Sequence, residues 1–187
     1  MMRTHYEIDF GKGIKRSLPL CRVNDTLYIG AFVIYGDVEL TVHAAERLLL
    51  KAPEFDIIIT AESKGIPICY EMSRQSGKPY LVANKNPKLY MKEAYKVEVR
   101  SITTEKKQQL YMDAETMAFM KDKKILIVDD VISTGNSVVA IEKLVREAGG
   151  KTAGRMAILA EGEAVHREDI IYLEKLPLFN PGGTEIK

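Results

Sequence analysis

Short runs of apolar, β-branched residues alternate along the chain with segments in which apolar residues recur at helical spacing. The run 56–60 (Asp-Ile-Ile-Ile-Thr) has no polar alternation, which is typical of a strand covered on both faces. Before it, residues 38–51 place Leu40, Ala44 and Leu48 on one side of a helix, and Pro53 follows. We therefore expect a helix over 38–51 and then a buried strand.

The same order of elements occurs twice. In each case an apolar strand, an amphipathic helix ending at glycine and a second apolar strand follow one another, which is the pattern of a right-handed parallel crossover. The first unit has its strand at 56–60, helix at 65–77 and strand at 79–83; the second has them at 124–129, 137–148 and 154–160. This predicts a single α/β domain over 1–187, with a central, mainly parallel sheet flanked by helices.

Two parts of the chain do not follow this order. Residues 1–36 are punctuated by glycine and proline, with short strands expected at 27–29 and 31–34. Residues 84–112 are polar and lysine-rich, with alternation over 96–103. We interpret 84–112 as an exposed hairpin with little core of its own, a kind of segment that often serves as a flexible lid.

Composition narrows the class of protein. Of 187 residues, 46% are hydrophobic and 28% charged, which excludes a disordered or fibrous chain. The 27 basic and 26 acidic residues give a net charge of +1, so no global field recruits nucleic acid or anionic lipid. Residues 1–9 lack the apolar run expected of a signal peptide, no stretch reaches membrane length, and the two cysteines fit free thiols in a reducing compartment. We expect a cytoplasmic protein without nucleic-acid or membrane partners.

The most informative segment is 127–137, where a buried strand ends in two acids and a short turn leads into a helix. Unpaired backbone N–H groups and the helix dipole at such a turn suit a phosphate group. Gly135 lets the backbone approach closely, while Thr134, Asn136 and Ser137 add side-chain donors. The segment therefore predicts an anion site at the carboxyl end of a strand.

The paired acids, Asp129 and Asp130, indicate a second ligand group. Carboxylates repel phosphate but accept hydrogen bonds from sugar hydroxyls and can assist a divalent cation. A phosphate and a diol at opposite ends of one loop describe a ribose 5-phosphate. The alternative is a connection in which Asp and Ser residues only cap the helix, although two adjacent acids exceed what a cap needs.

The segment 125–135 resembles the signature of the type I phosphoribosyltransferases: four apolar residues, two acids, two apolar residues, a small residue and Thr-Gly. The resemblance implies the fold of that family, with a hood from 1–36 and 161–187 and a flexible hairpin lid at 84–112. It also implies binding of 5-phosphoribosyl 1-diphosphate, with Asp129 and Asp130 on the ribose. The 5-phosphate would be held by Val131, Ile132, Ser133, Thr134, Gly135, Asn136 and Ser137.

Two further segments are similar to the adenine enzymes of this family. Residues 61–65 resemble their pyrophosphate loop, and 82–89 resemble a following loop with two lysines, although Asn84 stands where the family has arginine. The resemblance also implies a cis peptide in the first loop, which we expect at Ser63–Lys64. The residues implied to bind pyrophosphate are Glu62, Ser63, Lys64, Gly65, Lys85 and Lys88.

The implied reaction transfers the phosphoribosyl group to a purine, with Mg²⁺ carried by the substrate and assisted by Asp129 and Asp130, and with no separate side-chain metal cluster. The resemblance favours adenine; xanthine, hypoxanthine or guanine, and a non-catalytic sensor of phosphoribosyl diphosphate, remain alternatives. Glu161 and the pair 166–167 stand where purine enzymes have Glu and Gly-Arg. Family members are commonly homodimers. The residues expected to act in catalysis are Asp129, Asp130, Lys64 and the lid residue Glu105, and those expected to line the base pocket are Phe32, Val131 and Ile132.

Overall fold

The computed structural model describes residues 4–91, 93–100 and 107–186. At its centre is a five-stranded sheet in the order β10-β9-β8-β4-β5, in which every neighbouring pair of strands is parallel. These strands are β4 (Ile57–Ala61), β5 (Tyr80–Ala83), β8 (Lys124–Ile132), β9 (Lys151–Glu161) and β10 (Ile171–Leu176). The predicted parallel α/β sheet is confirmed, including both strand–helix–strand units.

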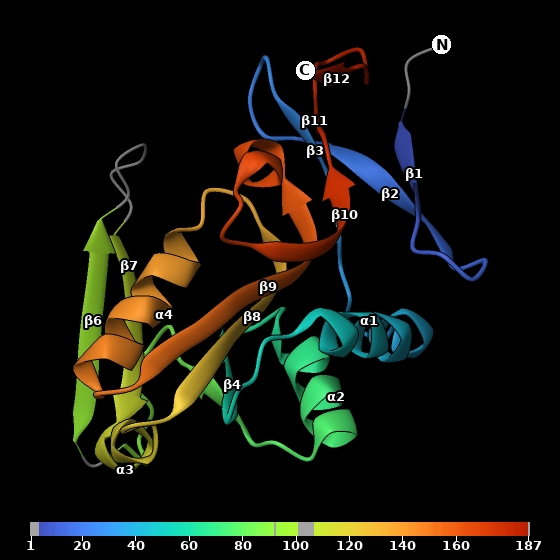
Figure 1. Ribbon diagram of the computed structural model, residues 1–187. Coiled ribbons are helices and arrows are strands. Elements are labelled where there is room, and N and C mark those ends of the chain that lie inside the picture. The colour runs from blue at the N-terminus through green and yellow to red at the C-terminus, as the bar shows by residue number, and fades with distance from the viewer. Residues whose placement is uncertain (1–3, 92, 101–106, 187) are drawn as a thin grey trace.

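Helices cover both faces of this sheet (Figure 1). Helices α1 (Val38–Lys51) and α2 (Ile66–Ser76) pack on one face, and α4 (Asn136–Glu147) packs on the other, together with the short α3 (Ala114–Phe119). Successive residues of a strand point to opposite faces, so Ile125 and Ile127 join the core under α4 while Leu126 and Val128 join the core under α1 and α2. The unbroken apolar strands are explained by this double coverage.

Local sequence explains where the helices begin and end. The carboxylate of Asp37 accepts a hydrogen bond from the backbone N–H of Leu40 and caps α1, whose bounds match the predicted 38–51. Helix α2 ends at Gly77, which adopts a left-handed conformation with φ of 69°. The strand predicted at 124–129 was too short, because β8 continues through both acids to Ile132 and pairs with β9 along that length.

The polar segment after β5 contains a hairpin of β6 (Ala94–Arg100) and β7 (Lys107–Asp113), which pair antiparallel as predicted. The expectation of little core was wrong for its base. Val97, Leu110 and Met112 are buried and belong to the same apolar cluster as residues of α4. The alternation along each strand therefore places one side of the hairpin against that helix.

A second sheet, in the order β1-β2-β3-β11-β12, joins the two ends of the chain (Figure 1). Its strands are β1 (His5–Asp9), β2 (Lys15–Arg22), β3 (Tyr28–Gly30), β11 (Leu178–Phe179) and β12 (Glu185–Ile186). Residues 5–9 and 15–22, read as irregular, are strands, whereas the strand expected at 31–34 is absent from the described structure. Residues 161–187 were expected to belong to the hood, but β10 lies within this range and pairs with β9 in the central sheet.

Between β9 and β10 lies a short 3-10 helix, η1 (Gly162–His166).

A bidentate ion pair joins the second sheet to α1: Arg16 of β2 donates from Nε to Asp37 at 2.6 Å and from Nη2 at 2.7 Å. In the described part of the chain, no helix is both long enough and apolar enough to span a membrane.

Candidate functional site

The central sheet has a switch point between β4 and β8. From β4 the chain continues outward to β5, and from β8 it continues in the other direction to β9 and β10. The loops after β4 and β8 therefore leave the sheet in opposite directions and open a crevice at the carboxyl ends of these strands. Both segments with predicted ligand-binding residues, 62–65 and 129–137, lie at this crevice.

The loop after β8 forms a small pocket of about 130 Å³ at the amino end of α4. Gly135 stands at the start of the helix with φ of 75°, a conformation that favours glycine. The N-cap residue Gly135 has no side chain to cap α4, and the residues of the first turn line the pocket, as expected of an anion site at a helix amino end. The pocket is lined by Asp129, Val131, Ile132, Ser133, Thr134, Gly135, Asn136, Ser137 and Val138. The structure thus brings the predicted phosphate residues together around one cavity.

Asp129 lies where the strand meets this pocket. Its Oδ1 accepts a hydrogen bond from the backbone N–H of Asp130 at 2.9 Å. Burial, followed by the negative charge of Asp130, raises the pKa of Asp129 to about 8. The carboxyl of Asp129 therefore holds its proton to a higher pH than an exposed aspartate does, and a nearby cation would favour its ionised form.

Asp130 points to the loop after β4 instead. Its side chain is 4% exposed, and Oδ2 lies 3.0 Å from the ammonium of Lys64. Oδ2 has this ion pair but no hydrogen bond of good geometry. Glu161, at the end of β9, faces the same two groups: burial raises the pKa of its carboxyl, the positive charge of Lys64 lowers it and Asp130 raises it again. Lys64, Asp130 and Glu161 form one charged cluster above the sheet.

Glu62 organises the predicted pyrophosphate loop. Its carboxylate accepts hydrogen bonds from the backbone N–H of Lys85 and from the ammonium of Lys88, both at 3.0 Å. These two bonds lower the pKa of Glu62 below its usual range. The cis peptide lies at Glu62–Ser63, so the prediction of Ser63–Lys64 was wrong by one residue. Ser63 in turn accepts a hydrogen bond from the hydroxyl of Tyr35 at 2.6 Å.

Three other residues named in the sequence analysis are not seen in the role considered for them. Asn84 forms a two-way backbone bridge with Tyr111, and its side-chain amide donates to Val82 O, so it supplies no cation in place of the family's arginine. The ring of Phe32 is 5% exposed and packs against Phe10, so it lies in the core rather than at a base pocket. Glu105 lies outside the described residues.

The base pocket expected from Phe32, Val131 and Ile132 needs correction on a second point. Ile132 is 2% exposed and packs in the core under α4. Val131 is only partly buried and remains available beside the pocket. Phe32 and Ile132 were assigned to the base pocket because β-branched and aromatic residues near a strand end can line a site, but such residues fill the interior as readily.

Two residues that were left out of the predicted binding and catalytic sets have contacts at this site. Tyr35 contacts Ser63, and Glu161 faces Lys64. The position of Glu161 at the carboxyl end of a central strand was a usable signal, since such positions face the crevice. No local pattern marks Tyr35, whose partner is 28 residues away.

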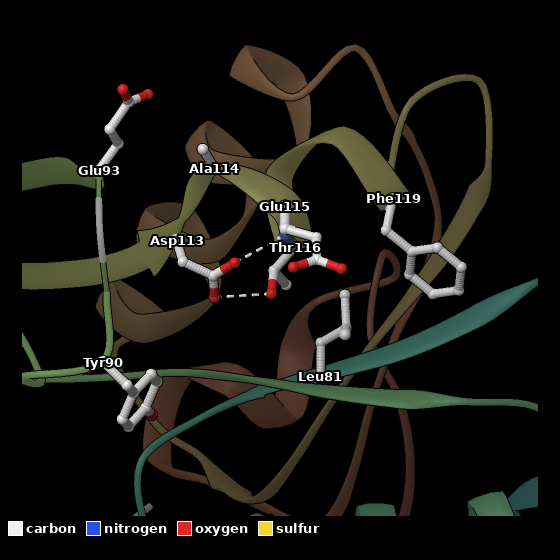
Figure 2. Close-up of a pocket in the computed structure, with 8 residues that line it drawn as sticks. All are labelled: Leu81, Tyr90, Glu93, Asp113, Ala114, Glu115, Thr116 and Phe119. Atoms are coloured by element: carbon white, nitrogen blue, oxygen red, sulfur yellow. Dashed lines mark hydrogen bonds between the residues drawn. The ribbon is translucent and has the colours of Figure 1, made fainter.

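A larger pocket, of about 830 Å³, lies elsewhere (Figure 2). It is bordered by β5, the segment before β6 and α3, which stands at the opposite end of the sheet from the loop after β8 (Figure 1). Asp113 in this pocket already caps α3, with hydrogen bonds to the N–H and hydroxyl of Thr116. Three carboxylates, those of Glu93, Asp113 and Glu115, line it, which disfavours an anionic ligand.

Asp129 and Asp130 are the acidic residues of the crevice to be tested for a fit to magnesium. Among the described residues, no group of three or more His, Cys, Asp or Glu side chains could hold a metal ion. Asp129 and Asp130 offer adjacent carboxylate oxygens, the ligands that Mg²⁺ prefers, and Mg²⁺ commonly combines one or two carboxylates with substrate phosphates.

Fold and site together define an α/β protein with a pocket suited to an anion at the amino end of α4, and comparison with known proteins identifies its family. Residues 40–176 match the model of the phosphoribosyl transferase domain, so the chain belongs to this family. The predicted family and fold are thereby confirmed.

Several similar proteins within the family carry the names of purine enzymes. The chain is 35% identical over 116 residues to a hypoxanthine/guanine phosphoribosyltransferase of Methanothermococcus okinawensis, covering 61% of this chain and 60% of the relative. It is 33% identical over 112 residues to an adenine phosphoribosyltransferase of Ureaplasma parvum, covering 60% and 62%. In fold it is similar to the crystal structure of adenine phosphoribosyltransferase from Thermoanaerobacter pseudethanolicus, with a TM-score of 0.65, 22% identity and coverage of 92% and 95%. The matches to the two sequence relatives thus span about three-fifths of their length.

Proposed function

We propose that the protein is a purine phosphoribosyltransferase that transfers the 5-phosphoribosyl group of 5-phosphoribosyl 1-diphosphate to a purine base. The observation that carries the proposal is the pocket at the amino end of α4, with Asp129 at its mouth and Asp130 beside it. Backbone donors suit the 5-phosphate, and the two carboxylates suit the ribose hydroxyls. The products are a nucleoside 5'-monophosphate and pyrophosphate.

In this reaction the bond from C1 of the ribose to pyrophosphate breaks, and a bond to a purine ring nitrogen forms. Negative charge develops on the departing pyrophosphate, and Lys64, whose ammonium lies 3.0 Å from Asp130, is a cation suited to stabilise it. Lys85 and Lys88 both contact Glu62 of the neighbouring loop, and we propose that they and the amides of 62–65 bind the same leaving group. Glu62 holds Lys88 and the backbone of Lys85 in place.

Magnesium belongs to this proposal as an ion bound with the substrate's phosphates. When bound, it supplies positive charge to the leaving pyrophosphate. Asp129 and Asp130 are the residues that would assist it, and their carboxylates also orient the ribose. The raised pKa of Asp129 fits a carboxyl that ionises as positive charge arrives.

Adenine is our first choice of base. The fold is similar to several structures of adenine phosphoribosyltransferases, and sequence relatives include both adenine and hypoxanthine/guanine enzymes. Hypoxanthine or guanine is therefore the second candidate, and xanthine the third. Val131 is the proposed apolar contact of the base, because Phe32 and Ile132 pack in the core.

A sensor of phosphoribosyl diphosphate is the alternative from another class. It is favoured by Asn84, whose side chain offers no positive charge where the family has arginine. Purified protein incubated with the donor, Mg²⁺ and adenine, hypoxanthine, guanine or xanthine separates these functions. Pyrophosphate release with one base supports the enzyme and names its substrate; tight donor binding without release for any base supports the sensor.

We further propose a homodimer in the cytoplasm, with the hairpin of β6 and β7 as a lid on the crevice. Free cysteines, Cys21 exposed and Cys69 buried, are in keeping with a reducing compartment. Exposed apolar residues such as Leu89, Tyr90 and Phe119 are in keeping with a further contact surface. Sedimentation of the purified protein tests the dimer, and cell fractionation tests the location.

A further inference from the structure

Arg167 lies directly over the turn that opens the phosphate pocket. Its Nη1 atom occupies the position that a Cβ at Gly135 would need, so a side chain there would overlap the guanidinium. Arg167 follows η1, beyond the end of β9, and is separated from the pocket motif by more than 25 residues. The fold therefore brings a cation to the pocket that the motif itself does not contain.

The orientation of Arg167 is set by Asp169. Nε donates to Oδ1 at 2.9 Å and Nη2 donates to Oδ2 at 2.7 Å, a bidentate pair that leaves the Nη1 end of the fork toward Gly135. These bonds lower the pKa of Asp169 and raise that of Arg167, so both stay charged at neutral pH. Asp169 also lies 3.6 Å from Arg155, which pairs with Glu142 of α4.

A phosphate group bound in this pocket would bring negative charge that the residues lining the pocket do not neutralise. Among the described residues that border it there is neither lysine nor arginine, and the one ionisable side chain is the carboxyl of Asp129. Lys64 is committed to Asp130 on the other side of β8. A phosphate monoester carries up to two negative charges, and backbone donors and a helix dipole offset only part of them.

We infer that Arg167 is the cationic residue that recognises the phosphate monoester in this pocket, with Asp169 as the residue that positions it. The inference rests on the proposed function, in which the ligand group is the 5-phosphate of a ribose. Gly135 is then required twice, for its left-handed backbone and for the space in which the guanidinium reaches the anion. The competing explanation is that Arg167 serves only the ion-pair network with Asp169, Arg155 and Glu142.

Calorimetric titration of the full chain with ribose 5-phosphate separates these explanations. For Arg167→Gln we expect the dissociation constant to rise about tenfold or more, because a charge-assisted hydrogen bond is lost. The matched control is Arg146→Gln, an exposed arginine in the last turn of α4, about 15 Å farther along the helix axis. This control has the same change in net charge and should leave the affinity unchanged.

Two further variants and a second ligand test the assignment against a structural role. Arg167→Lys keeps the charge without the fork and should fall between wild type and Arg167→Gln. Asp169→Asn leaves the arginine unpositioned and should weaken ribose 5-phosphate binding while pyrophosphate binding stays unchanged. Equal weakening of both ligands would indicate general disruption and would overturn the inference. Should Arg167→Gln lose its thermal transition, Arg167→Lys carries the test alone.

The outcomes also separate this inference from the proposed function. If the wild type does not bind ribose 5-phosphate, the assignment of the pocket falls, and this inference falls with it. If the wild type binds and Arg167→Gln binds equally well, the pocket assignment stands and only the role of Arg167 is overturned.

Discussion

The ammonium of Lys64 lies 3.0 Å from Oδ2 of Asp130, and this ion pair joins the loop after β4 to the end of β8 across the switch point. The two residues belong to segments expected to bind opposite parts of one substrate, the pyrophosphate and the ribose. In the substrate-free protein each offsets the charge of the other. In the proposed reaction, contacts to the substrate replace this ion pair. The lysine then contacts phosphate oxygens, while the carboxylate accepts hydrogen bonds from sugar hydroxyls.

The first prediction concerns the acidic partner. Asp130→Asn should raise the KM for the phosphoribosyl donor and lower kcat, each by about tenfold, because the amide is a weaker acceptor and leaves Lys64 unpaired. Steady-state kinetics with saturating base measure both. Asp25→Asn, on the exposed turn before β3, is the control and should behave as wild type. Wild-type constants for Asp130→Asn would remove this residue from the ribose site.

The second prediction concerns the basic partner. Lys64→Ala should weaken inhibition by pyrophosphate, raising its inhibition constant about tenfold, because a cation facing the leaving group is removed. Lys12→Ala is the control, since Lys12 forms only an exposed pair with Glu46. Should the inhibition constant stay the same in the Lys64 variant, this residue is not in the pyrophosphate site.

The third prediction is a dependence of stability on pH. The pKa of Asp129 is raised from 3.8 to about 8 in the folded protein, so between these values the folded state binds more protons than the unfolded state. The free energy of unfolding therefore falls as the pH rises through this window. Asp129→Asn does not titrate and should flatten that fall, so its Tm relative to wild type increases from pH 5 to pH 8. Parallel curves for the two proteins would contradict the assigned pKa shift.

The fourth prediction follows from the packing of Gly65 against β4 and β8. A Cβ at this position would overlap Thr60 Oγ1 and lie 2.9 Å from Asp129 Oδ1. Gly65→Ala should destabilise the protein by about 1–3 kcal/mol, as overpacking does. Gly182→Ala is the control: its added Cβ meets only Asn180 Oδ1, at 3.3 Å, and the effect should stay within about 0.5 kcal/mol. Urea unfolding measures both, and equal stabilities would contradict the contact.

Periodicity predicted the central sheet well because burial there follows the strand and helix repeats. Each β-branched run is covered on both faces, and α1 spans the predicted 38–51 and ends before Pro53. The length of β8 was underestimated because acids seldom continue a buried strand. Here the chain remains paired to β9 at Asp129, where a carboxyl meets the crevice instead of the core.

The second sheet was not predictable because its order depends on distant segments. Strand β3 pairs with β11, about 150 residues later in the chain, and each is only two or three residues long. The hairpin presents the same difficulty. Val97 and Leu110 are apolar positions in a polar segment, and only the apolar flank of α4 makes them core residues.

The candidate site, too, could be predicted from the sequence only in part. The residues that line the pocket at the amino end of α4 lie close together in sequence, and one motif contains most of them. The partners of Lys64, Ser63 and Gly135 are Asp130, Tyr35 and Arg167, which lie 28 to 66 residues away in sequence. Such contacts come from the meeting of three loops, and no local spacing encodes them.

Helix α4 is shared by two parts of the molecule. Its amino end lines the pocket proposed to bind phosphate, and its flank packs on the hairpin, where Lys143 also donates a hydrogen bond to the carbonyl of Glu98 at 3.3 Å. One rigid element therefore borders both the pocket and the hairpin. We expect truncation of Val97 or Leu110 to loosen the packing of this helix as well as that of the hairpin.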